Sequence, residues 1–391
     1  MALFFLASIA GLFPGLTLPM ELGWKAVHPF DLIFVACLGL AASRRAFRAP
    51  DWPLILAGSG LVAAGGIALW IHPSTAGFRA VITLAYSLAV LLAVSHIDLE
   101  ALDVRIDRTI VWPLLIAVGV AGVVFALENV LGLSIGPNNP RSLPAGLHRF
   151  GGLTGANALI LFLGLGGPFV RASWLTTVAI LLPAYATLSR GLLGVGIALL
   201  TRERWKVKGS WGRVLLLGSL LGIALGLFAY AFALVPVKSA QRTSFNVSLE
   251  PGGYLTLHHA ALRMLQSHPF VGVGPGQFVK EYRGFTSQAE RDYVFEEDVP
   301  GWAPHSAVLG LAAEQGLPAL AALGWLFHLI FRRLSRIPDP ELRASAMAGL
   351  TGLLVGGHFV DWLTLKGLWL WIGLMVASRS SAQGNLPPTA Q

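Results

Sequence analysis

PHSAVLGLAAEQGLPALAALGWLFHLIF, residues 304–331, is the stretch that decides the fold. A long polar segment ends just before it, and the run after His305-Ser306 is mostly apolar. It is long enough to cross a bilayer, which takes about 20 residues of helix. An imidazole at the rim of such a helix is costly to keep without a purpose, and near neutral pH it can accept or donate a proton. The stretch therefore predicts a transmembrane helix with a functional histidine, His305, at one end.

Apolar runs of this kind recur along the whole chain. Of its 391 residues, 55% are hydrophobic and 12% are charged, whereas soluble proteins have about 25% charged residues. Hydropathy and length predict about twelve spans, and the eighth is short enough to be a partial span. Their expected ranges are 2–20, 27–43, 53–72, 78–95, 111–133, 155–171, 173–189, 191–201, 214–235, 304–331, 344–361 and 363–378. We therefore expect an all-α polytopic membrane protein, with residues 2–20 retained as its first helix because they lack a basic stretch and a cleavage site.

Three short basic loops predict the orientation. The net charge of +8 comes largely from these loops, so it is an orienting signal and does not indicate a nucleic-acid partner. With twelve spans, the three loops and both termini fall on one face, which the positive-inside rule makes cytoplasmic. The basic residues of the loops are Arg44, Arg45, Arg48, Arg202, Arg204, Lys206, Lys208, Arg213, Arg332, Arg333, Arg336 and Arg343.

The opposite face receives the polar segments 134–154 and 236–303. The second is by far the longer, and it contains a helical-looking piece at about 254–267. Loops of this length are usually functional or disordered, and its aromatic and apolar content favours an ordered cap. The chain thus divides into N-terminal helices, central helices, this large outer loop, and C-terminal helices with a short tail. The four parts are residues 1–133, 134–235, 236–303 and 304–391.

Two arginines share the predicted outer face with His305. Arg190 lies in Ser189-Arg190-Gly191 between two apolar spans, and Arg263 lies in the large loop. Two guanidinium groups and one imidazole suit a pyrophosphate substrate that must lose a sugar to a hydroxyl. An interfacial arginine that reaches for lipid headgroups is the alternative interpretation of Arg190.

A glycine-rich turn, HPFVGVGPGQF at residues 268–278, follows Arg263. Its glycines allow a tight backbone, and the amides of Gly274 and Gly276 are candidates for binding a phosphate. A purely structural turn is the alternative.

Further candidate substrate-binding residues also lie at the outer ends of spans. Arg149 precedes Asn157, which begins the next span and can equally cap a helix. His358 and Asp361 are one helical turn apart and can orient each other, although ordinary helix-end polarity explains them as well. Ser306 completes the set. No metal site is expected, because the single cysteine, Cys37, lies in an apolar run and no histidine has a fitting partner.

These segments resemble the O-antigen ligase and polymerase superfamily. The resemblance runs from about Arg149 to about Asp361, in the order Arg149–Asn157, Ser189-Arg190-Gly191, Arg263 with the glycine-rich turn, and His305-Ser306 followed after nine residues by Gly316. In the ligase pattern, Gly, Thr or Tyr stands three positions after that glycine. Here the position is Ala319, a departure that bears on ligase against polymerase.

The resemblance implies a GT-C-like membrane glycosyltransferase of the bacterial inner membrane, with its site on the periplasmic face. Its donor is a glycan on undecaprenyl pyrophosphate, and it needs neither metal nor cofactor. Ligases pass the glycan to lipid A–core, polymerases to another lipid-linked repeat unit, and related members to protein. His305, Arg190 and Arg263 would then be catalytic.

Other classes of function fit less well. A transporter of lipid-linked glycans is expected to have polar groups at mid-membrane and internal repeats, and neither is evident. A membrane scaffold leaves Arg190, Arg263 and His305 without a role. Within the transferase class, His305-Ser306 and the short chain favour ligase over polymerase.

Overall fold

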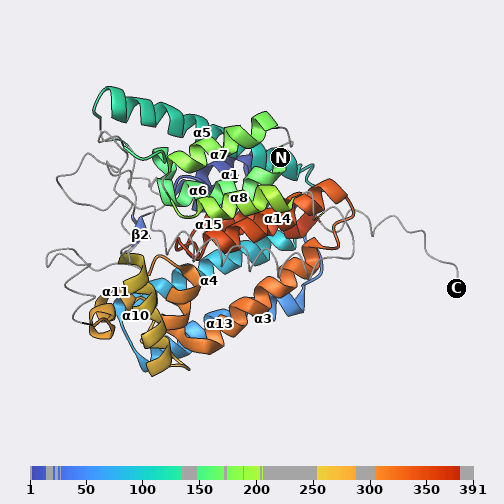
Figure 1. The fold of residues 1–391 in the computed structure, drawn as a ribbon. Coiled ribbons are helices and arrows are strands. Elements are labelled where there is room, and N and C mark those ends of the chain that lie inside the picture. The colour runs from blue at the N-terminus through green and yellow to red at the C-terminus, as the bar shows by residue number, and fades with distance from the viewer. Residues whose placement is uncertain are drawn as a thin grey trace, which may run out of the picture.

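The computed structural model describes residues 2–14, 21–22, 25–26, 28–133, 135, 148–170, 174–187, 189–202, 205, 253–287 and 304–378. These residues are helical apart from turns and one antiparallel pair of two-residue strands, β1 (Glu21–Leu22) and β2 (Lys25–Ala26) (Figure 1). The helices are α1 (Ala2–Gly11), α2 (Pro29–Ser43), α3 (Trp52–Ile71), α4 (Thr75–Ser95), α5 (Ile106–Val130), η2 (Gly152–Thr154), α6 (Ala156–Gly166), η3 (Gly167–Phe169), α7 (Trp174–Ala186), α8 (Leu192–Thr201), α10 (Gly253–Ser267), α11 (Phe278–Glu281), η5 (Tyr282–Phe285), α13 (Ala307–Leu334), α14 (Pro340–Gly356) and α15 (Lys366–Ala377). The predicted all-α class is confirmed.

Four of these helices are long and apolar enough to cross a membrane: α3, α4, α5 and α13. The chain is therefore a membrane protein. Shorter helices occupy parts of the other expected spans, namely α1, α2, α6, α7, α8, α14 and α15. The expected ninth span, 214–235, lies outside the described residues. The count of twelve stays a prediction.

Small residues let helix backbones touch in one half of the molecule, where α14 packs against α6 and α8. A Cβ added at Gly194 of α8 would collide with the Gly352 carbonyl of α14, and one at Gly349 would collide with the Leu165 carbonyl of α6. Without water between helices to drive association, close van der Waals packing of this kind is a main source of affinity. It places the start of α8 beside the end of α14.

In the other half, α13 packs against α3, and α15 packs against α4. Helix α13 bends at Gly316, whose φ of 76° is left-handed. A side chain there would strike the backbone of Phe270, and one at Gly272 would strike the backbone of α13 at Glu314. The glycine-rich turn therefore fits into the bend of α13 because neither partner has a Cβ at the contact.

The large loop contributes an ordered helical cap. The expected helical piece is confirmed as α10, and Leu257, Met264, Phe278 and Tyr282 form a buried cluster with Ala313 of α13. Figure 1 shows α10 and α11 at one end of the long helices, where α13 begins.

At the opposite end of the helices, the described parts of the basic loops meet. Arg333 at the end of α13 forms an ion pair with Asp51, which precedes α3. Arg202 at the end of α8 lies 3.3 Å from the carboxylate of Glu341 in α14. The described parts of the three basic loops thus lie at one end of the helices, as the prediction that they share one face of the membrane requires. The side of the membrane on which it lies stays a prediction.

Candidate active site

His305 stands at the entrance to α13 in an unusual backbone conformation. Its φ is 48°, in the left-handed region. Ser306 then caps the helix, its hydroxyl accepting the Leu309 amide at 3.2 Å. The amide of Ala307 donates to the Gly357 carbonyl at 3.0 Å. These bonds hold the imidazole between the start of α13 and the end of α14.

Arg149 is held by two hydrogen bonds in the segment before η2. Its Nε donates to the Thr187 carbonyl at 2.5 Å, and its Nη2 donates to Asn157 Oδ1 at 3.3 Å. The hydroxyl of Thr187 in turn accepts the Ser189 amide at 3.2 Å. Arg149 is thereby tied to the short stretch that carries Arg190.

Arg190 lies just before α8, so the packing of α8 against α14 also sets the position of Arg190. The next residue, Gly191, packs against Ile160 of α6. Because α8 touches α14 through Gly194 and Gly352, the start of α8 is fixed near the end of α14, where Gly357 contacts Ala307.

These positions put two positive charges near the imidazole of His305. Burial lowers the pKa of His305 from its ordinary value, and the charges of Arg190 and Arg149 lower it further. Both causes disfavour the imidazolium form. His305 is therefore neutral near pH 7 and able to accept a proton.

His258 of α10 joins this group from the cap. Burial lowers its pKa to about 4, with smaller contributions from Arg190, His358, His305 and His259. The site thus receives side chains from the cap and from α8, α13 and α14. No sequence spacing relates His258 to His305, so only the tertiary structure reveals that the two lie near each other.

Arg263 lies on a different face of α10 from His258. Its Nη1 donates to the Phe285 carbonyl at 2.8 Å and so ties α10 to η5. Arg190 and Arg149 are cations that act on His305. Arg149 is tied through Thr187 to the stretch that carries Arg190, and the expected catalytic role of Arg263 stays a prediction.

The amides of the glycine-rich turn have other partners than the expected phosphate. The Gly276 amide donates to Glu314 Oε2 at 2.9 Å, and the Phe278 amide donates to Oε1 at 3.1 Å. The Gly274 amide donates to the main-chain carbonyl of Glu314 at 3.0 Å. Glu314 thus takes the place that we expected an anion to take. This corrects the interpretation of Gly274 and Gly276 as phosphate-binding residues in favour of the structural alternative.

The other residues expected to bind substrate differ in their surroundings. Ser306 is fully buried and its side chain caps α13. Asn157 orients Arg149. The side chains of His358 and Asp361 are exposed, and Asp361 accepts the Leu363 amide at 3.3 Å. The described structure records no hydrogen bond between these two side chains, and their role in substrate binding stays a prediction.

No group of three or more histidine, cysteine, aspartate or glutamate side chains that could hold a metal ion occurs within the described residues. The described site contains a neutral imidazole and two guanidinium groups. Such a set can bind an anionic leaving group and accept a proton from a hydroxyl.

Comparison with known families agrees with this geometry. The family model described as O-antigen ligase matches residues 156–324. The match begins at α6 and extends into α13, and it includes Arg190, His258 and His305. No curated protein matches the chain. Residues 156–324 of the chain are thus similar to the O-antigen ligase family.

Proposed function

We propose that this membrane enzyme transfers a glycan from undecaprenyl pyrophosphate to a hydroxyl of lipid A–core, as an O-antigen ligase. The observation that carries the proposal is the position of His305 beside Arg149 and Arg190. The family match supports a ligase- or polymerase-type membrane enzyme. The predicted topology puts the site on the periplasmic face of the inner membrane.

In the proposed reaction, the acceptor oxygen attacks the anomeric carbon of the donor sugar. A new carbon–oxygen bond forms while the bond to the pyrophosphate oxygen breaks, and undecaprenyl pyrophosphate leaves with the electron pair. His305 takes the acceptor proton. The lowered pKa of His305 keeps it in the form that can do so at neutral pH.

Arg149 and Arg190 hold the leaving group in this scheme. Each guanidinium can make two charge-assisted hydrogen bonds to a phosphate. Fixed cations aimed at developing charge are worth about 3–4 kcal/mol for each donor lost. Asn157 and the Thr187 carbonyl hold Arg149 in place before the substrate arrives. His358 and Asp361 are both exposed, and in this proposal they contact sugar hydroxyls.

The test supplies purified full-length protein with a lipid-linked glycan, plus either lipid A–core or excess donor. A glycan joined to lipid A–core is the expected product. Chain extension on the lipid carrier, with no transfer to lipid A–core, would make the enzyme a polymerase.

The polymerase alternative has one observation in its favour. Ala319 stands where the ligase pattern, as the resemblance implies it, has Gly, Thr or Tyr. In the structure Ala319 is buried in α13 just after the bend at Gly316. It lies in the helix and not at the rim, so its effect would act through the path of α13.

A further inference from the structure

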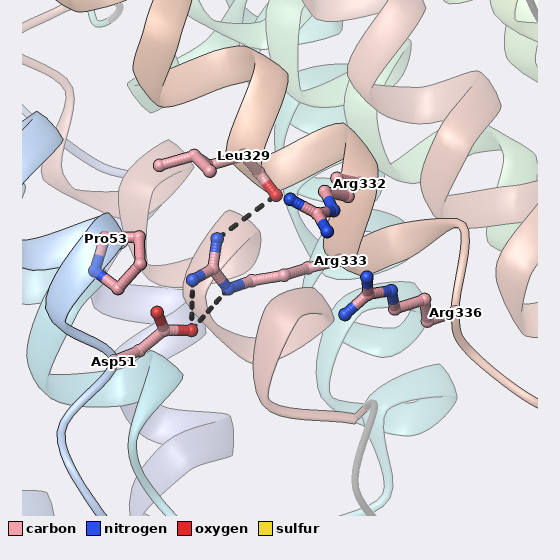
Figure 2. A pocket seen from close by; sticks show the side chains of 6 residues that line it. All are labelled: Asp51, Pro53, Leu329, Arg332, Arg333 and Arg336. Atoms are coloured by element: carbon pink, nitrogen blue, oxygen red, sulfur yellow. Dashed lines mark hydrogen bonds and ion pairs between the residues drawn. The ribbon is translucent and has the colours of Figure 1, made fainter.

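A polar cavity lies at the opposite end of α13 from His305. It has a volume of 240 Å³ and is lined by Asp51, Pro53, Leu329, Arg332, Arg333 and Arg336 (Figure 2). The proposed transfer reaction leaves this cavity without a role, because His305 and Arg332 stand at opposite ends of a helix of 28 residues.

The one carboxylate of the cavity is already paired. Arg333 Nε donates to Asp51 Oδ2 at 2.6 Å, a second nitrogen of the same guanidinium also contacts that oxygen, and Nη1 donates to the Leu329 carbonyl at 3.2 Å. Burial opposes ionisation of Asp51, but the hydrogen bond and charge of Arg333 outweigh it, so the pKa of Asp51 lies below its ordinary value. Asp51 is thus charged and neutralised by Arg333.

Arg332 and Arg336 supply the remaining charge. They are exposed and four residues apart, Arg332 in the last turn of α13 and Arg336 just beyond the end of that helix. Within the described part of the chain, their side chains make no hydrogen bond or ion pair. Two like charges that line one small cavity repel each other. An anion between them removes that repulsion, and in Figure 2 the guanidinium groups of both turn toward the space beside Arg333.

Two tryptophans indicate the depth of the cavity in the membrane. Trp52, next to Asp51 and Pro53, is 63% exposed, and Trp325, two turns before Arg332, is 55% exposed. Tryptophans on the lipid-facing surface concentrate at the level of the headgroups. Both belong to helices that are long enough to span, α3 and α13. The cavity therefore opens where lipid phosphates lie.

We propose that this cavity binds the phosphate group of an anionic phospholipid. Arg332 and Arg336 bind the phosphate oxygens. The ion pair of Arg333 with Asp51 keeps the end of α13 next to the start of α3, where the cavity lies. The planar guanidinium fork matches phosphate geometry, and basic pockets between transmembrane helices bind anionic headgroups. The site is separate from the proposed transferase site and does not depend on it.

Native mass spectrometry of the detergent-purified full-length protein tests this. The probes are phosphatidylglycerol, phosphatidylcholine with the same acyl chains, and inorganic phosphate. Phosphatidylglycerol should be retained in preference to phosphatidylcholine. The double variant Arg332→Gln/Arg336→Gln should weaken its affinity roughly 30-fold, about fivefold for each arginine removed. Lysine at both positions should recover only part of the loss.

The matched control is Arg44→Gln/Arg45→Gln. These two arginines are exposed, lie beyond α2 on the same predicted face, and do not line the cavity. The control should bind phosphatidylglycerol normally. An equal loss in the control, equal retention of the two lipids, or displacement of the lipid by inorganic phosphate at similar concentration would each overturn the proposal. Thermal unfolding of both double variants, expected near that of the parent, shows that the lost affinity is not lost fold.

Discussion

His305 occupies a backbone conformation that most residues avoid. Left-handed φ values cost a non-glycine residue about 1–3 kcal/mol, although asparagine, aspartate and histidine tolerate them better than others. Strain of this kind collects at functional sites. It also decides how the residue is best tested, because His305→Ala adds a conformational penalty to the loss of the imidazole.

His305→Asn therefore gives the cleaner measurement. We expect turnover to fall by about 10²–10⁴-fold, the usual value of a general base, while donor affinity stays close to normal. Donor binding and single-turnover rates measured on the same preparation check this. Near-normal turnover in folded His305→Asn protein would remove the general-base role.

The pH dependence of turnover follows from the same residue. Acid protonates His305 and abolishes its capacity as a base. Because burial and two arginines lower its pKa, turnover should begin to fall only below the ordinary histidine value of about 6.5. Arg149→Gln removes one of those charges, so the acid limb of its normalised pH–rate profile should move to higher pH. An unmoved limb contradicts the closeness of Arg149 to His305.

The arginines are expected to differ in what they contribute. Arg149→Ala and Arg190→Ala should each weaken donor binding and cost about 3–4 kcal/mol of transition-state stabilisation. Arg263→Ala should act mainly by loosening the contact of α10 with Phe285, so it should lower thermal stability more than donor affinity. Lysine at 149 or 190 should recover only part of the activity. Donor affinity lost chiefly in Arg263→Ala would restore the original pairing of Arg190 with Arg263.

At the scale of elements, Glu314 joins α13 to the cap. Its carboxylate accepts the amides of Gly276 and Phe278, and α10 is continuous with that turn. Glu314→Ala leaves two amides without their acceptors, at about 1–3 kcal/mol each. Glu314→Gln keeps one acceptor oxygen and should lose less.

Thermal unfolding and limited proteolysis of the cap measure this effect. We expect the order parent, Glu314→Gln, Glu314→Ala in decreasing protection of the cap. The alanine variant should also lose activity, because His258 reaches the site from α10. Full activity with an unprotected cap would show that the cap does not complete the site.

The contact between α8 and α14 offers a second test at this scale. Gly194→Leu forces the two backbones apart, which we expect to cost about 1–3 kcal/mol or more and to move Arg190 away from His305. Gly196, two residues further along α8, has open space around it. Gly196→Leu should therefore leave stability and transfer close to those of the parent. Equal effects of the two variants would mean that the interhelical contact does not position Arg190.

For the whole molecule, the arrangement of charge predicts the orientation. The site and the cap lie at one end of the helices, and Arg48, Arg202, Arg332 and Arg333 lie at the other. Cysteines placed at Ser287, in the cap, and at Ser335, after α13, should differ in labelling by an impermeant thiol reagent in intact cells, after Cys37 is replaced. We expect labelling at Ser287 only. Labelling at Ser335 alone would reverse the orientation and contradict the periplasmic site.

The membrane class and many of the helices could be predicted from the sequence. Apolar runs of bilayer length and basic loops are local signals, and they depend only on how each segment partitions between lipid and water. The helix at about 254–267 was likewise predictable, because helix periodicity and the proline after it are local as well.

The partners within the site could not be predicted in the same way. The Thr187 carbonyl ties Arg149 to the stretch that carries Arg190, and the amides of Gly274 and Gly276 donate to Glu314, which lies 38 residues from Gly276. His258 reaches His305 only because the cap packs on α13.

The sequence by itself thus determined that this chain is helical and enters a membrane. Only the tertiary structure decided which groups lie together in the site and which hold segments together by hydrogen bonds. The physical reason is that partition into the bilayer is a property of each segment alone. Hydrogen bonds and charge contacts between distant segments depend on how the helices pack, and here glycines such as Gly194 and Gly316 set that packing.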